Sequence, residues 1–62
     1  MANVKVGVRV RMVFCEDPDA PSPGEEGTVS FIDDAGTVFV NWDNGSRLGM
    51  IERAGDRIEK IA

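Results

Sequence analysis

The chain has 62 residues, carries a formal net charge of −4 at pH 7 and contains no histidine. A chain this short forms one small domain, which excludes a separate cofactor-binding domain and a deep active-site cavity. Hydrophobic residues make up 42% of the chain, enough for a core and too many for a disordered tail. We therefore expect a single domain over residues 1–62, with residues 1–5 as a disordered N-terminus.

The first organised segment, residues 6–14, alternates side chains in the way of a strand with one buried face. The side chains expected to face the core are Val6, Val8, Val10, Met12 and Phe14. The solvated face is expected to carry Gly7, Arg9, Arg11 and Val13. The pattern therefore predicts a first strand with two arginines on its outer surface.

A long irregular loop is expected to follow at residues 15–24, which hold all three prolines of the chain. Five acidic residues line this loop and its exit: Glu16, Asp17, Asp19, Glu25 and Glu26. The low sequence pI of about 4.5 therefore describes this loop more than the whole surface.

Residues 27–33 favour a second strand, and residues 37–42 favour a third. The alternation of apolar and polar positions fails between Phe31 and Ile32, which indicates a bulge or a sharp bend. Between the two strands, residues 33–36 (Asp-Asp-Ala-Gly) are typical of a turn.

The third strand is expected to enter a tight hairpin and return as a fourth strand over residues 46–51. A two-residue turn at Asn44 and Gly45 would place Leu48 and Met50 on the face opposite the apolar side chains of the third strand. A three-residue loop, with Gly45 in the left-handed conformation, gathers the apolar side chains on one face instead. We predict the three-residue loop.

This register pairs Val40 with Leu48 and Val38 with Met50. It leaves Phe39 pointing outward, with Asn41 and Arg47 beside each other on the same outer surface. Trp42 is expected to cap the core near the hairpin.

Residues 52–57 are too short for a stable α-helix and favour one 3₁₀ turn before a short closing strand at residues 58–61. Five short strands so close in sequence must curl up to bury a shared core. The order of elements predicts an all-β, five-stranded SH3-like barrel with a long acidic loop between its first two strands.

Five motifs resemble one small, uncharacterised domain-of-unknown-function family of bacteria and their phages. They are residues 7–11 (Gly-Val-Arg-Val-Arg), 16–18 (Glu-Asp-Pro), 23–29 (Pro-Gly-Glu-Glu-Gly-Thr-Val), 33–36 (Asp-Asp-Ala-Gly) and 40–45 (Val-Asn-Trp-Asp-Asn-Gly). The resemblance covers residues 7–61 and implies an SH3-like fold and a cytoplasmic bacterial or prophage setting. It implies no catalytic residues.

The residue chemistry does not favour an enzyme. General acid–base catalysis near neutral pH most often uses histidine, and the chain has none. Cys15 is the single cysteine and has no histidine to activate it, so we expect an inert thiol. The acidic loop does not match the spacing of a calcium-binding loop. We therefore expect no catalytic, cofactor-binding or metal-binding residues and no small-molecule substrate.

We expect instead a non-enzymatic binding module, whose partner is another protein or a second copy of the chain. Phe39, Asn41 and Arg47 are the candidate contact residues, because an outward phenylalanine can anchor a protein interface. One alternative is a nucleic-acid-associated accessory protein that uses Arg9, Arg11 and Arg47, although the net charge disfavours it. Another is a phage-encoded inhibitor whose acidic loop, with Asp17 and Asp19, meets a basic host protein. The composition predicts no membrane partner and a cytoplasmic location.

Overall fold

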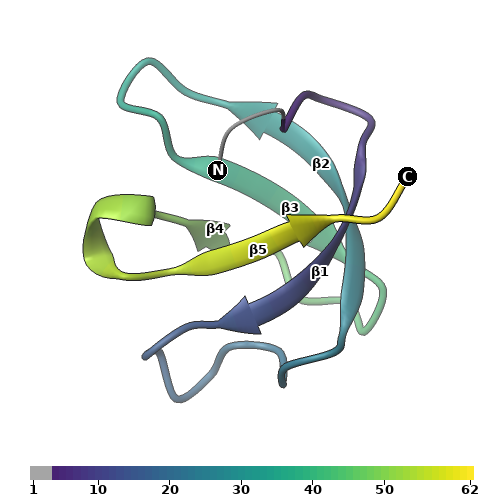
Figure 1. Cartoon of the computed structure of the whole chain (residues 1–62), viewed down its shortest axis with the longest axis vertical. Helices are drawn as coiled ribbons and strands as arrows, with labels where there is room; N and C mark the ends of the chain where they lie inside the picture. Colours follow the sequence, from purple (N-terminus) through teal and green to yellow (C-terminus); the bar gives the residue numbers. More distant parts are fainter. Residues whose placement is uncertain (1–3) are drawn as a thin grey trace.

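The computed structural model describes residues 4–62, and within that range the regular elements are five β-strands and one 3₁₀ turn. In chain order they are β1 (Arg9–Phe14), β2 (Glu26–Ile32), β3 (Val38–Trp42), β4 (Gly49–Met50), the 3₁₀ turn η1 (Glu52–Ala54) and β5 (Arg57–Lys60). All strand pairs are antiparallel, in one sheet of order β4-β3-β2-β1-β5 (Figure 1). The predicted all-β architecture with one 3₁₀ turn is confirmed, and β4 and β5 form the two edges of the sheet.

The sheet bends around one hydrophobic core. Its buried side chains are Val10, Met12, Val29, Val38, Val40, Trp42 and Met50. Strand β1 is not a neighbour of β3 or β4 in the sheet, yet side chains from all three pack in this cluster. The sheet therefore folds over on itself, and β1 and β5 cross in front of β3 in Figure 1.

Strand β1 is shorter than the predicted 6–14 segment. Val10 and Met12 are buried as expected, but Val6 is 61% exposed and Phe14 is 48% exposed. Gly7 adopts a left-handed turn conformation (φ +92°), so β1 begins only at Arg9. At the other end the pairing of β1 with β5 shifts between Met12 and Phe14. The prediction that Val6 and Phe14 face the core is therefore wrong.

The loop at residues 15–25 is irregular, as predicted, and backbone hydrogen bonds attach it to β1. The Gly24 N–H donates to the Met12 carbonyl over 2.8 Å, and the Met12 N–H donates to the Glu25 carbonyl over 2.7 Å. Pro21, within this loop, is buried. The loop therefore follows the end of the sheet closely.

The predicted three-residue hairpin loop is confirmed. Val38 pairs with Met50, the Trp42 N–H donates to the Ser46 carbonyl over 2.9 Å, and Gly45 has a φ of +96°. Strand β4 is shorter than the predicted 46–51 segment because side chains bond both peptide groups of Leu48. The Trp42 indole N–H donates to the Leu48 carbonyl over 3.2 Å, and the Leu48 N–H donates to Ser46 Oγ over 3.4 Å.

The two ends of the described chain also pack on the sheet. Val4 lies against the core, whereas residues 1–3 of the predicted disordered N-terminus fall outside the described residues. At the other end η1 is followed by Gly55 in the left-handed conformation, and the Ile61 N–H donates to the Arg9 carbonyl over 2.9 Å. No helix within residues 4–62 has the length and apolar character needed to cross a membrane.

Candidate protein-binding surface

A bulge in β2 builds the most distinctive surface of the sheet. Val29 pairs with Val40 and Ile32 pairs with Val38, but the register between β2 and β3 shifts around Ser30. The extra residue reverses the alternation of side chains. Phe31 therefore lies on the outer face, paired with Phe39, and is 58% exposed.

The Phe39 ring lies over Gly49 of β4, and the Phe31 ring lies beside the Phe39 ring. Their centroids are 6.0 Å apart, and the ring planes are inclined by 36°. A Cβ atom added at Gly49 would lie 3.1 Å from the Phe39 ring and 3.0 Å from the Thr37 methyl group. Gly49 therefore provides the space in which the Phe39 ring lies. We call the surface formed by Phe31, Phe39, Thr37 and Gly49 the aromatic face.

Further exposed groups lie around the aromatic face. The Gly7 N–H donates to the Val29 carbonyl over 2.8 Å, which holds the segment that carries the exposed Val6 against the middle of β2. Along β3, Asn41 is exposed and pairs with Thr28. The hairpin register places the exposed Arg47 opposite Asn41, as predicted.

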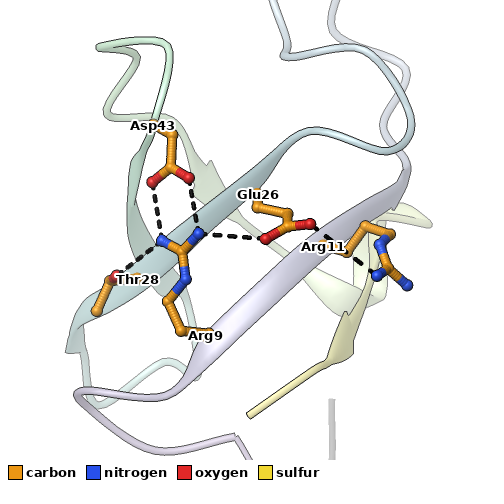
Figure 2. Close-up of polar contacts among 5 residues, drawn as sticks. All are labelled: Arg9, Arg11, Glu26, Thr28 and Asp43. Atoms are coloured by element: carbon orange, nitrogen blue, oxygen red, sulfur yellow. Dashed lines mark hydrogen bonds and ion pairs between the residues drawn. The ribbon is translucent and has the colours of Figure 1, made fainter.

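Arg9 lies at the centre of an ion-pair cluster beyond the aromatic face (Figure 2). Its guanidinium binds both carboxylate oxygens of Asp43, over 2.8 and 2.7 Å, and contacts Thr28 and Glu26 over 3.2 Å each. The hydrogen bond to Asp43 contributes most to a raised pKa of Arg9, and the bond to Glu26 adds to it. The same hydrogen bond from Arg9 lowers the pKa of Asp43. Arg9 thus joins β1 to β2 and to the hairpin loop through exposed or half-buried groups.

Arg11 extends this cluster toward β5. Its guanidinium donates to Glu59 over 2.6 Å and lies 4.0 Å from Glu26. Arg9 and Arg11 are thus on the outer surface, as the sequence predicted, but each is held by carboxylates. Glu26, expected at the exit of the acidic loop, belongs to this cluster.

Asp17 and Asp19 lie on the exposed part of the acidic loop, away from the ion-pair cluster. The Asp17 carboxylate accepts the Asp19 N–H over 2.8 Å, and the Asp17 carbonyl accepts the Ala20 N–H over 3.0 Å. Asp17 therefore forms a local turn.

Cys15 and Asp56 meet at the base of the loop. Burial raises the pKa of the Cys15 thiol, a backbone hydrogen bond at Asp17 lowers it, and a hydrogen bond to Asp56 raises it further. Asp56 is only 7% exposed, and its carboxylate accepts the Ile51 N–H over 2.8 Å. Asp56 therefore connects the end of β4 to the start of β5, a role that sequence reasoning missed.

Neither a cavity nor a metal cluster of three or more cysteine, aspartate or glutamate side chains is found within residues 4–62. The chemistry of the described surface consequently depends on exposed side chains. The structure brings together Phe39, Asn41 and Arg47, as the sequence predicts, and adds Phe31 to the aromatic face beside Phe39. The break in alternation between Phe31 and Ile32 is the sequence signal for the additional ring.

One protein family matches almost the whole chain, including the aromatic face and the ion-pair cluster. The family described as "Domain of unknown function (DUF4314)" matches residues 2–61. The chain belongs to the DUF4314 family. Its match spans β1 to β5, so the aromatic face and the ion-pair cluster both lie within the DUF4314 domain. No curated protein and no solved structure matches the chain at a significant level.

Proposed function

We propose that this DUF4314 domain is a non-enzymatic protein-binding module whose contact surface is the aromatic face. The observation that carries the proposal is the Ser30 bulge, which places Phe31 beside Phe39 outside the core. Burying a phenylalanine side chain stabilises a fold by about 1.5–3 kcal/mol. A partner that covers both rings would recover this contribution at the interface.

The composition of the surface also supports a protein partner. Aromatic residues and arginine are enriched at protein interfaces, where a few such side chains supply most of the binding energy. Phe39, Asn41 and Arg47 combine a ring, an amide and a guanidinium along one hairpin. An apolar centre with polar groups beside it is the usual composition of such a contact.

We propose that the bent sheet is an SH3-like barrel, in which the loop at residues 15–25 and the turn η1 occupy the usual connections. The order of the strands and the single 3₁₀ turn between β4 and β5 support this assignment. The motif resemblance supports a bacterial or phage origin, and with the single cysteine it supports a cytoplasmic setting.

The two alternatives have less support from the described contacts. A nucleic-acid role would require Arg9 and Arg11 to leave Asp43, Glu26 and Glu59 before they could contact phosphates. An inhibitor that acts through Asp17 and Asp19 would bind its partner by charge alone. The Asp17 carboxylate is already used within the loop, where it accepts the Asp19 N–H.

Affinity capture tests the proposal. The wild-type chain, a Phe31→Ser/Phe39→Ser double variant and a Val13→Ser control are each immobilised and exposed to a lysate of the source organism, with untagged chain added. Val13 is 45% exposed but lies at the opposite end of β1 from the aromatic face, so it controls for a lost apolar group. We expect wild type and Val13→Ser to retain the same protein, and the double variant to lose it. Equal retention by all three would exclude the aromatic face as the contact surface.

A further inference from the structure

The charges at the two ends of the aromatic face point to a particular partner. Arg47, opposite Asn41, lies at the hairpin end, and Asp34 lies in the turn between β2 and β3 at the other end. Both residues are exposed, and among residues 4–62 neither takes part in an ion pair. One unpaired positive charge and one unpaired negative charge therefore flank the two rings.

The two charges lie at opposite ends of the rings along the strand direction. Two residues of extended chain, about 7 Å, separate Phe39 from Asn41, which is the register partner of Arg47. Three residues separate Phe31 from Asp34, at most about 10 Å. A two-fold axis through the rings would therefore bring the Arg47 end of one copy onto the Asp34 end of the other.

We propose that the aromatic face binds a second copy of this chain in a face-to-face two-fold dimer, with Arg47 of each copy against Asp34 of the other. The inference rests on the proposed function and names its partner. Phe31 and Phe39 of the two copies form the centre of the contact, between sheets about 10 Å apart. An isologous contact needs a self-complementary surface, which an apolar centre between opposite charges provides.

Size supports an extended contact. A stable interface covers about 800 Å² on each partner, which is about a fifth of the 3871 Å² surface of this chain. Two rings cover only part of that area, so the contact must reach the ends of the hairpin, where Arg47 and Asp34 lie. A small domain also gains stability from association, because its own core is small.

Sedimentation equilibrium of charge variants tests the dimer. Arg47→Glu and Asp34→Arg each place like charges against each other at both symmetric contacts. We expect each variant alone to dissociate about tenfold more readily than wild type. Mixed together, however, the two variants restore opposite charges at both contacts, so the mixture should form a heterodimer about as stable as the wild-type dimer. Asp19→Arg, which adds the same charge on the acidic loop, is the control and should leave association unchanged.

A wild-type chain that remains monomeric up to about 1 mM would overturn the dimer, as would variants that show no recovery on mixing. Circular dichroism of each variant verifies that it is folded. Failure of the dimer is distinguishable from failure of the proposed function. If capture of a different protein still requires Phe31 and Phe39, the aromatic face remains a binding surface and only the second copy is excluded.

Discussion

Phe31 pairs with Phe39 on the outer face of the sheet, although Val29, two residues before Phe31, is buried in the core. In a regular strand, residues two apart point to the same face. The bulge at Ser30 breaks that rule and separates a buried valine from an exposed ring. The outer position of Phe31 is thus fixed by the backbone.

Because Phe31 and Phe39 are outside the core, replacing them should affect stability little. We expect Phe31→Ser to lower the free energy of unfolding by less than about 1.5 kcal/mol, the upper range for an aromatic pair. Met12→Ala, which removes a fully buried side chain, should lower it by about 2–5 kcal/mol. Urea denaturation at low protein concentration measures both values. A loss in Phe31→Ser as large as that in Met12→Ala would show that Phe31 supports the core.

The ion pair between Arg9 and Asp43 should make stability depend on pH. Folding lowers the pKa of Asp43 below the usual aspartate value of about 3.9, because Arg9 donates to its carboxylate. The pair therefore stabilises the fold at neutral pH, and this contribution is lost as the pH falls through the folded pKa. Asp43→Asn should have a lower melting temperature than wild type at pH 7, and this difference should fade as the pH falls below the usual aspartate pKa.

Thermal unfolding across this pH range, at low salt, measures the effect of Asp43→Asn. Asp19→Asn is the matched control, since the Asp19 carboxylate lies on the exposed loop outside the ion-pair cluster. A melting-temperature difference between wild type and Asp43→Asn that persists unchanged at pH 2 would contradict the role given to this carboxylate.

Gly27 and Gly45 should respond differently to the same substitution. A Cβ atom at Gly27 would lie 2.8 Å from the Asn41 carbonyl oxygen and 2.9 Å from the Trp42 Cα atom, so β2 and β3 would have to separate. We expect Gly27→Asn to cost at least about 1–3 kcal/mol of stability, as overpacking does. Gly45 has open space and a φ of +96°, which asparagine tolerates, so Gly45→Asn should cost about 1 kcal/mol or less. Equal losses in chemical denaturation would contradict this steric argument.

Asp56 should matter as a hydrogen-bond acceptor. Asp56→Ala leaves the N–H of Ile51 without the carboxylate that accepts it, which should cost about 1–3 kcal/mol. Asp56→Asn keeps an oxygen in the same place and should retain most of the stability. If urea denaturation shows the two variants to be equally destabilised, the negative charge of Asp56, beside Cys15, is what the fold needs.

The sequence predicts local features of the fold more successfully than contacts between distant residues. The three-residue hairpin loop follows from Gly45 and from the need to keep Val38 and Met50 on one face. The bulge is visible as a break in alternation, although the structure centres it at Ser30 rather than between Phe31 and Ile32. Such patterns depend on neighbouring residues, so they can be deduced before the fold is known.

The errors arise where tertiary contacts override local patterns. Phe14 fits the alternation of β1, but the register shift against β5 exposes it. The pairing of Arg9 with Asp43 joins residues far apart in sequence, and neither alternation nor composition predicts which carboxylate an arginine will meet. Phe31 differs from these cases: the sequence shows the break in alternation, but the break alone does not say which side of it moves to the outer face, and the structure places the shift at Ser30, one residue before Phe31.

The most direct test of the account is a concentration series of NMR spectra that resolves the ring protons of Phe31 and Phe39. We predict that these rings, and the backbone amides of Asn41 and Arg47, shift or broaden as the protein concentration rises from micromolar to millimolar. The amides of the loop at residues 15–25 should remain unchanged. Spectra of the rings that do not change with concentration, or changes confined to the acidic loop, would contradict the claim that the aromatic face is where a second copy binds.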